Sequence, residues 1–438
     1  MISIGLCMIV KNEEAVLRRI LTPMSKLVDK IYICDTGSVD KTKEIAREFT
    51  DEVYDFLWKD DFSAARNFIT EKADTDYWMW LDADDVITPE NQEKLLRLKE
   101  SMDSDTDVVM MDYAVGFDEW EHVTFSYYRE RIMKTSRNFR WQGRVHETVV
   151  PAGNILYSDV VIEHRKIKAG ESFRNLHIYE QMIDSGEKME PRHFFYYGRE
   201  LFYHKQYEYA ILILKKFLEE PDGWIEDKLN SCLVLSCCYQ AMGENAAAFD
   251  ILFYSFTMDV PRAEICCEIG RLFMEKREYV TAAYWYQQAL LAPRKKKNGG
   301  FYIADSHDFI PAIQMCVCLD KAGRHREAFE FHKKARVLKP LHQAVIGNEK
   351  YFRDVWGMER EGKFTCIVSI SYIDSEYLSC YGRMCMFFDR HNQKNSSEKE
   401  ASGDITCTSC FGNNNRCGCD CSCSGQGATG PLGATGPM

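Results

Sequence analysis

The N-terminal part of the chain alternates between short apolar runs and segments in which apolar residues recur with the period of a helix. The apolar runs cover residues 2–10, 30–34 and 78–81, and the helical patterns cover residues 14–24 and 42–49. Alternation of this kind predicts βαβ units, so we expect an α/β domain with a mainly parallel sheet. In open sheets of this type, ligands bind at the carboxyl ends of the strands.

Polar residues follow each of the three apolar runs. They are Lys11-Asn12-Glu13-Glu14, Asp35-Thr36-Gly37-Ser38 and Asp82-Ala83-Asp84-Asp85. Because the carboxyl ends of parallel strands meet at one edge of a sheet, we expect these side chains to converge and form a nucleotide site. Asp35 can accept hydrogen bonds from a base or a ribose, and Gly37 permits the turn.

Two carboxylates at a spacing of two residues, Asp82 and Asp84, suit a divalent cation. On a strand, side chains at this spacing share a face, so both can point into one cleft while Ala83 packs away from it. Mg²⁺ and Mn²⁺ take oxygen ligands, usually one or two carboxylates together with substrate phosphates. The alternative is an acidic turn that is solvated or that caps the helix expected to begin near Thr88.

Arg66 lies in a polar segment between the second and third of these strand ends, Asp61-Phe62-Ser63-Ala64-Ala65-Arg66-Asn67. Its guanidinium group offers a forked donor to a phosphate. The alternative is a solvated residue on a helix.

From about Pro191 the pattern changes to helical pairs in which a small residue, an aromatic residue and an alanine recur. The steps between Ala210, Ala248, Ala282 and Ala328 are 38, 34 and 46 residues. These spacings predict tetratricopeptide-like repeats, in which small residues let paired helices approach. A generic helical bundle is the alternative. The concave face of such an array could hold a polypeptide or a second copy of the chain.

The last segment differs in composition from both of these regions. Six cysteines lie between Cys407 and Cys423, and both a zinc site and disulfide cross-links remain open for them. Glycine then occupies every third position from Gly427 to Gly436, which is the pattern of collagen, although the run is too short for a stable triple helix. The expected organisation is an α/β domain over residues 1–185, helical repeats over 186–345, and an irregular, cysteine-rich and collagen-like tail over 346–438.

Composition narrows the class of protein. The chain has 438 residues, 45% of them apolar, which allows two or three domains with substantial cores. A net charge of −12 argues against general nucleic-acid binding. We see no secretory signal and no run of about 18 apolar residues, so we expect no membrane span and a cytoplasmic location. Several cysteines lie in apolar runs and are expected to be free core residues: Cys7, Cys34, Cys232, Cys237 and Cys238.

Four motifs, in this order along the chain, resemble those of glycosyltransferase family 2: Met8 to Glu14, Asp35 to Thr42, Asp61 to Asn67 and Leu81 to Asp85. Members of this family have the GT-A fold and use nucleotide sugars. Residues 142–147 and 194–201 resemble a subgroup with helical repeats after the catalytic domain, which includes the sublancin peptide S-glycosyltransferase. The resemblance covers about residues 1–340. It implies transfer of a sugar from a nucleotide sugar, with a UDP-sugar favoured, and inversion of the anomeric configuration.

The resemblance also implies roles for individual residues. Four of them would line the pocket for uridine or another nucleoside: Val10, Asn12, Glu13 and Asp35. Arg66 and Asp82 would position the ribose and the diphosphate. Asp84, with Asp82 beside it, would contact a Mn²⁺ or Mg²⁺ ion. His164 matches the place where related enzymes bring in a later metal ligand, and the alternative is a structural histidine at a strand end.

The acceptor needs a base within hydrogen-bond reach of its proton. Glu147 and His146 are the best candidates, because they end the cluster Trp141-Gln142-Gly143-Arg144-Val145-His146-Glu147, in which an aromatic residue and a glycine indicate a shaped loop. The alternative is that these two residues only hold that loop. Many family members place the base in a Glu-Asp pair, which has no clear equivalent here.

The C-terminal triplets resemble the start of bacterial collagen-like spore-surface glycoproteins, in which Gly-x-Thr triplets carry O-linked sugar. This implies a protein or peptide acceptor, with Thr429 and Thr435 as acceptor-like residues, and a spore-surface location reached through the tail. Three other hypotheses remain: an inactive, repeat-based adaptor, a structural spore-surface component, and an enzyme that extends a glycan on a lipid or polysaccharide.

Overall fold

The computed structural model describes residues 2–167, 173–294 and 300–357. The cysteine-rich segment and the collagen-like triplets, with Thr429 and Thr435, lie outside the described residues. Within them, no helix is long and apolar enough to cross a membrane. No disulfide bond joins any two of the nine cysteines that the structure describes, and all except the half-buried Cys237 are buried.

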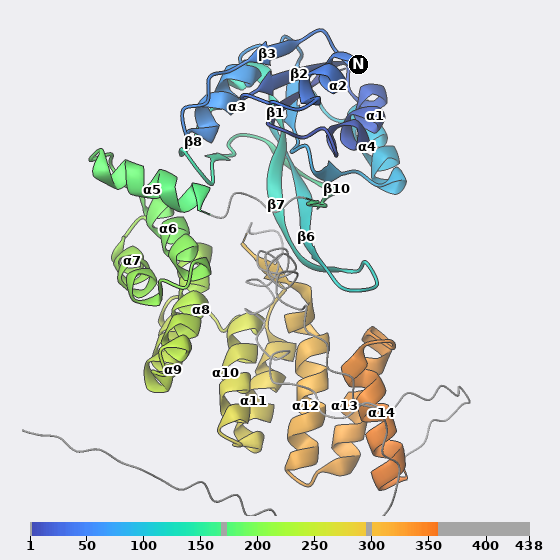
Figure 1. The fold of residues 1–438 in the computed structure, drawn as a ribbon. Coiled ribbons are helices and arrows are strands. Elements are labelled where there is room, and N and C mark those ends of the chain that lie inside the picture. Colours follow the sequence, from blue (N-terminus) through green and yellow to red (C-terminus); the bar gives the residue numbers. More distant parts are fainter. Residues whose placement is uncertain (1, 168–172, 295–299, 358–438) are drawn as a thin grey trace, which may run out of the picture. The chain divides into compact units, whose positions relative to one another are not determined.

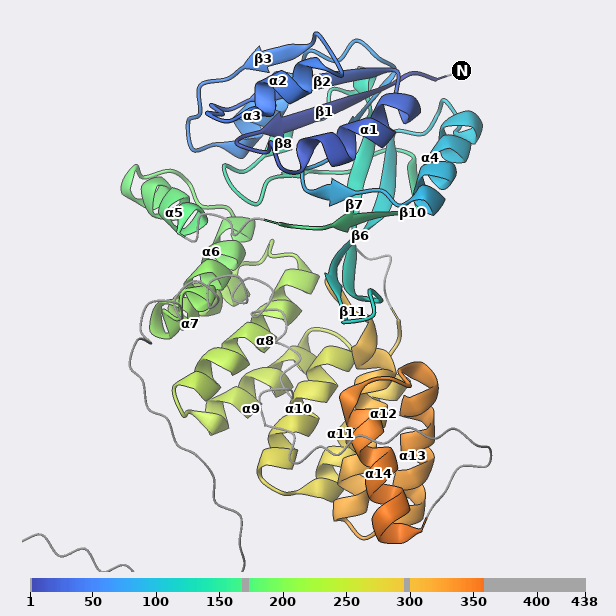
Figure 2. The same ribbon diagram turned by 45° about the vertical axis from the view of Figure 1, so that its right-hand side comes forward.

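The first part of the chain is an α/β domain built on one large sheet (Figures 1 and 2). The strand order is β3-β2-β1-β4-β7-β6-β10-β5, with β11 paired to β7. The strands are β1 (Ile4–Val10), β2 (Lys30–Asp35), β3 (Val53–Asp55), β4 (Tyr77–Trp80), β5 (Asp85–Val86), β6 (Val108–Phe117), β7 (Val123–Lys134), β10 (Ile155–His164) and β11 (Tyr302–Ile303).

The first four strands of this order, β3, β2, β1 and β4, are parallel, as are β6 and β10. Strand β7 runs antiparallel to β4 and β6, and β5 and β11 are also antiparallel to their neighbours. A second, two-stranded sheet pairs β8 (Trp141–Gln142) with β9 (Thr148–Val149). The predicted GT-A-like α/β fold is confirmed, and the antiparallel strands are additions to its parallel part.

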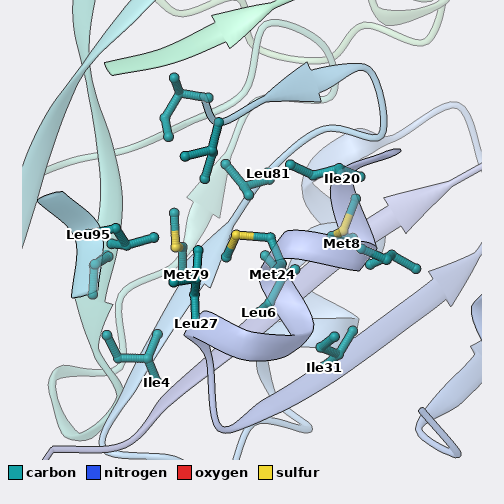
Figure 3. Close-up of a cluster of buried hydrophobic side chains, with 14 of the residues drawn as sticks. Ile4, Leu6, Met8, Ile20, Met24, Leu27, Ile31, Met79, Leu81 and Leu95 are labelled. Carbon is teal, nitrogen blue, oxygen red and sulfur yellow. The ribbon is translucent and has the colours of Figure 1, made fainter. Parts of the chain in front are cut away.

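Helices cover both faces of the large sheet: α1 (Leu17–Leu27), α2 (Thr42–Arg47), α3 (Phe62–Thr70) and α4 (Pro89–Ser101). Alternate residues of β1 and β4 point to opposite faces. Leu6, Met8 and Met79 pack with α1 on one face, as Figure 3 shows, and Cys7 and Trp78 pack with α3 on the other. Because these strands are buried on both faces, they read as continuous apolar runs.

Helix α1 begins at Leu17 rather than at the predicted Glu14. The two residues at the predicted start have other partners. The backbone N–H of Glu13 donates to Thr42 Oγ1 at 2.7 Å, and the Glu14 carboxylate accepts from the Lys41 backbone N–H at 3.0 Å. These bonds hold the end of β1 against the loop after β2 and delay the helix.

The second part of the chain consists of paired helices. They are α5 (Arg174–Asp184), α6 (Pro191–Tyr203), α7 (Tyr207–Glu219), α8 (Ile225–Ala241), α9 (Asn245–Tyr254), α10 (Ala263–Glu275), α11 (Tyr279–Leu291), α12 (Phe309–Lys321), α13 (His325–Leu338) and α14 (Gln343–Trp356). Short 3-10 turns lie at Thr135–Arg137, Ser255–Thr257 and Ala304–His307.

The small residues that marked the repeats lie where the helices of a pair meet. A Cβ atom added to Gly198 of α6 would stand 2.5 Å from Leu214 of α7, and one added to Gly270 of α10 would stand 3.0 Å from Tyr286 of α11. The alanines used for the spacing are all fully buried: Ala210, Ala248, Ala282 and Ala328. The predicted solenoid of tetratricopeptide-like repeats is confirmed.

The predicted end of the repeats at residue 345 falls inside α14, so an irregular tail that begins at residue 346 is a wrong boundary. The helix continues to Trp356 because Val345 and Phe352 are buried against the preceding repeat, with 1% exposure each. Composition did not predict this continuation of the helix, because several polar residues lie between Val345 and Phe352.

Candidate functional site

The carboxyl ends of β1 and β2 lie side by side, because Val10 pairs with Asp35 in the parallel register. Asn12, at a positive φ of 56°, donates its backbone N–H to Ser38 Oγ at 2.9 Å, and its side-chain oxygen accepts from the Val39 N–H at 2.8 Å. The structure thus brings the predicted nucleoside residues Val10, Asn12 and Asp35 together, with Glu13 tied to the same loop through Thr42.

Asp35 is 2% exposed, and its two carboxylate oxygens differ. Oδ1 accepts the backbone N–H groups of Gly37 at 3.0 Å and Ser38 at 2.9 Å. Gly37 has a φ of 107°, a conformation that glycine adopts without strain. Oδ2 is buried and has no hydrogen-bond partner among the described residues. A buried acceptor without a donor is costly, so it fits a ligand that supplies one, such as a base or ribose.

Arg66 lies on α3, whose first residue follows the N-cap Asp61; the Asp61 carboxylate accepts the Ala64 N–H at 2.9 Å. The Arg66 side chain is 8% exposed and bridges two acids. Nη2 donates to Asp82 Oδ1 at 2.8 Å, and Nε donates to Glu147 Oε1 at 2.6 Å. The solvated alternative for Arg66 is therefore wrong.

Two indole rings complete the setting of the Arg66 guanidinium group, which stands 4.7 Å from the ring of Trp80 and 4.8 Å from that of Trp141. The same helix holds the loop that carries Trp141. The Asn67 side chain donates to the Trp141 carbonyl at 3.0 Å and accepts the Trp141 N–H at 2.9 Å. The segment 61–67 thus positions residues 141–147, which we call the Trp141 loop.

Asp82 and Asp84 do not lie on a strand, so the expectation of a shared strand face is wrong. Strand β4 ends at Trp80, and a turn closed by the Asp85 N–H and the Asp82 carbonyl at 3.1 Å follows. The predicted packing of Ala83 is confirmed, since it is 6% exposed in the core. Burial alone would raise the pKa of Asp82, but the charges of Arg66 and Arg131 outweigh it and lower this pKa to about 2.

A cluster of possible metal ligands lies at this turn. Asp84, Asp85 and His164 each offer an atom, and these atoms lie within 4.8 Å of one another; within the described residues no other such group is found. His164 comes from β10, which pairs with β5 so that His164 stands opposite Asp85. Its Nδ1 is 3.4 Å from an oxygen of each acid. Burial acts to lower the pKa of His164, but the two acids outweigh it and raise the pKa.

Asp85, which the sequence analysis placed at the strand end without a role of its own, is fully buried and uses both of its oxygens. Oδ1 accepts from the Tyr113 hydroxyl at 2.9 Å and faces His164 Nδ1; Oδ2 accepts the Asp82 N–H at 3.0 Å and lies 3.3 Å from Arg131 Nη1. Burial raises the pKa of Asp84, with His164 opposing. The Asp84 carboxylate and the His164 imidazole, with the Asp85 carboxylate beside them, fit a divalent cation such as Mn²⁺.

The two candidate bases have partners. The Glu147 carboxylate accepts from Arg66. His146, at a φ of 52°, places its Nε2 2.8 Å from Glu200 Oε1 and stacks on Tyr196 with ring centroids 4.2 Å apart. These contacts give both residues a part in holding the Trp141 loop, and a catalytic role for either one stays a prediction.

Sequence reasoning also missed the cations of β7. Arg129 stands 4.8 Å and Arg131 3.9 Å from the Trp80 ring, so two arginines spaced by two residues point to one face. The run Arg129-Glu130-Arg131, in which the sign of the charge alternates within a strand, was a usable signal. Lys166 was missed as well. Burial lowers its pKa, and the charges of Asp84 and Glu13 act against this.

Residues 6–165 match the model of the family described as Glycosyl transferase family 2. The chain carries a family 2 glycosyltransferase domain. All the predicted site residues lie within this domain. The partners of His146, Tyr196 and Glu200, lie outside it on α6.

The glycosyltransferase domain and the repeats each have relatives. The SPbeta prophage-derived glycosyltransferase SunS of Bacillus subtilis (strain 168) is 25% identical over 268 residues, which are 58% of this chain and 62% of SunS. The chain thus spans less than two thirds of the length of this relative. A TPR repeat-containing protein of Synechococcus elongatus is 33% identical over 150 residues, 34% of this chain and 36% of that protein.

Among solved structures, the glucosyl-3-phosphoglycerate synthase from Mycobacterium tuberculosis in complex with Mn²⁺ and UDP-glucose matches with a TM-score of 0.30 and 13% identity. It covers 43% of this chain and 81% of that chain. A likeness of this extent adds nothing on ligands.

Proposed function

We propose that this protein is a metal-dependent glycosyltransferase that moves a sugar from a UDP-sugar to a hydroxyl or thiol of a protein or peptide. The observation that carries the proposal is the meeting of Asp84, Asp85 and His164 beside the Arg66–Asp82 pair, inside a family 2 glycosyltransferase domain. The relative SunS, a glycosyltransferase by name, supports the sugar-transfer class.

The nucleoside would bind at the ends of β1 and β2. Asp35 Oδ2 is the buried acceptor there that lacks a donor, and Val10 and Asn12 lie beside it. The diphosphate would extend towards Arg66, whose Nε and Nη2 are used by the two acids, which leaves Nη1 to donate. The rings of Trp80 and Trp141 keep this cation in place and exclude water from its faces.

Asp84 and His164 would hold a Mn²⁺ or Mg²⁺ ion, with Asp82 close to them and Asp85 orienting His164. When bound, the ion supplies positive charge to the departing diphosphate. Arg66 adds a second positive charge on the protein side, which is the electrostatic stabilisation that leaving-group departure requires.

The repeats and the tail favour a polypeptide acceptor over a lipid or polysaccharide. Tetratricopeptide-like arrays form extended surfaces of the kind that bind polypeptides. The collagen-like triplets with Thr429 and Thr435 supply a candidate acceptor sequence and the case for a spore-surface role.

The experiment is a transfer assay with the full chain, Mn²⁺, a panel of nucleotide sugars and a peptide of Gly-Ala-Thr triplets, followed by mass spectrometry. We expect one donor to add the mass of one hexose or N-acetylhexosamine to the peptide, and Asp84→Asn to abolish the addition. Asp159→Asn, at an exposed position of β10, is the control and should transfer normally. If no donor in the panel is bound or consumed, the proposed function is wrong.

A further inference from the structure

The Trp141 loop turns sharply at His146, the residue before Glu147. His146 has a φ of 52°, in the left-handed region that a residue with a Cβ atom adopts only at a cost in free energy. Such a conformation persists only where its surroundings hold it. The contacts that hold His146 come from the helical repeats, beyond residue 165, where the match to the family ends.

Helix α6 holds His146 at three points. Its Nε2 lies 2.8 Å from Glu200 Oε1 and donates to it, because an ionised carboxylate only accepts. The ring stacks on Tyr196, with centroids 4.2 Å apart and planes at 15°. Arg192 donates its Nε to the His146 carbonyl at 3.2 Å. One helix of the repeats thus fixes the ring and the backbone of His146.

Glu200 is 7% exposed and is itself held in place. Its Oε1 also accepts from the Asn175 side chain of α5 at 3.0 Å. Burial acts to raise the pKa of Glu200, but the hydrogen bonds from His146 and Asn175 and the neighbouring charges outweigh it and lower this pKa. The carboxylate is therefore ionised at neutral pH, and its bond to His146 is charge-assisted and stronger than a neutral one.

Glu147, the next residue, carries this restraint into the donor site. Its Oε1 accepts from Arg66 Nε at 2.6 Å, and Arg66 in turn binds Asp82. The Glu147 carbonyl oxygen lies 3.5 Å from Nη2 of Arg129 on β7. Contacts therefore run without a gap from α6 of the repeats, through residues 146 and 147, to Arg66.

The left-handed turn at His146 is not needed to attach the loop to the repeats. Val145 is buried in a cluster with Tyr179 and Met182 of α5, and Arg144 lies 3.4 Å from Glu187. These contacts alone join the loop to the repeats. The φ of residue 146 determines instead the direction in which residue 147 leaves the turn, and with it the place of the Glu147 carboxylate.

We propose that Glu200, supplied by the repeats rather than by the glycosyltransferase domain, is a positioning residue for the donor. It holds His146 in its left-handed conformation and so keeps the Glu147 carboxylate on Arg66. This rests on the proposed function, in which Arg66 receives the diphosphate. A Glu147 carboxylate released from Arg66 places an unpaired negative charge near the phosphates and removes one of the two acids that orient the guanidinium group. Both changes weaken donor binding.

The test is a double-substitution cycle on the full chain. The variants are Glu200→Gln, Glu147→Gln and the two together. Glu187→Gln is the matched control, because it removes an acid of the repeats that faces the same loop at Arg144. Calorimetry with UDP-glucose and UDP-N-acetylglucosamine in Mn²⁺ measures donor affinity, and urea unfolding measures the stability of each variant.

We expect Glu200→Gln to bind the donor about 3- to 30-fold more weakly than the wild type, the usual range for residues coupled in one network. Glu187→Gln should bind it as the wild type does. In the Glu147→Gln background, Glu200→Gln should change the affinity by less than about 2-fold, because no carboxylate is left to be misplaced. A purely structural role of Glu200 predicts the same loss in both backgrounds.

His146→Asn is a second route to the same result. Asparagine tolerates the left-handed conformation, but its side chain is too short to reach Glu200, so this variant should weaken donor binding as Glu200→Gln does. If Glu200→Gln does not fold, His146→Asn takes its place in the cycle with Glu147→Gln.

Wild-type affinity in both Glu200→Gln and His146→Asn, or an equal loss with and without Glu147, overturns the inference alone. A wild type that binds neither UDP-sugar refutes the proposed function on which the inference rests. The connection from Glu200 to Glu147 is then still tested by the unfolding data. The two substitutions should be non-additive in the free energy of unfolding, and additive values contradict the connection.

Discussion

At the scale of the residue, the sequence identifies Arg66 as a functional candidate, and the fold determines its partners. The motif 61–67 was enough to single it out as a cation for the donor. Its two acidic partners come from residues 82 and 147, which lie 16 and 81 positions away in sequence. For the same reason the sequence assigned no role of its own to Asp85 and did not single out Arg131, because the partners of both residues are brought to them only by the fold.

Replacing Arg66 by methionine leaves Asp82 and Glu147 without their shared cation. Because the side chain is 8% exposed, we expect a loss of about 3 kcal/mol in the free energy of unfolding, the usual cost of breaking a buried ion pair from one side. Urea unfolding measures it. Lys43→Met, which removes the exposed pair with Asp55, is the control and should cost less than about 1 kcal/mol. Equal losses in the two variants would show that Arg66 is not held as described.

Asp227, which is buried in the first turn of α8, predicts a pH dependence of stability. Burial raises its pKa to about 7 in the folded chain, against about 4 when unfolded, so between these values the unfolded state releases a proton that the folded state keeps. Stability therefore falls from pH 4 to pH 7 by an amount on the order of 2 to 4 kcal/mol from this group, and is constant in this respect above pH 7. Asp227→Asn should be more stable than the wild type at pH 8 and similar to it at pH 4. Parallel stability profiles for the two proteins would contradict this.

At the scale of the element, the strands β1, β2 and β4 were predictable because burial on both faces gives uninterrupted apolar runs. The start of α1 was not, because side-chain and backbone bonds to residues 41 and 42 hold Glu13 and Glu14 outside the helix. The pairing of β5 with β10 was also beyond the sequence. It joins His164 to Asp85 across 79 residues, and β5 itself has only two residues.

The helix pairs predict opposite effects for one substitution at two glycines. Gly198→Ala puts a Cβ 2.5 Å from Leu214 and forces α6 and α7 apart, at a cost of about 1 to 3 kcal/mol. Gly347→Ala in α14 meets nothing within 4 Å and should stabilise by about 0.5 to 1 kcal/mol through helix propensity. Thermal unfolding of the two variants measures both signs. A neutral Gly198→Ala would mean that the pair is looser than described.

At the scale of the whole described chain, the glycosyltransferase domain and the repeats share contacts. Tyr302 and Ile303, in the connection after α11, add β11 to the sheet beside β7. Lys339, at the end of α13, binds Asp118 of the β6–β7 turn at 3.1 Å. The alanine spacing predicted the repeats themselves. It could not predict these attachments, because they depend on single residues in loops.

The central claim is that a divalent cation at Asp84 and His164 joins the protein to the diphosphate of the donor. The most direct measurement is calorimetric titration of the full chain with UDP-glucose and UDP-N-acetylglucosamine, in Mn²⁺ and in EDTA, for the wild type and Asp84→Asn. We expect binding in Mn²⁺ that weakens by about 10- to 100-fold in EDTA and in Asp84→Asn. Equal affinity with and without Mn²⁺, or an unchanged affinity in Asp84→Asn, would contradict the claim.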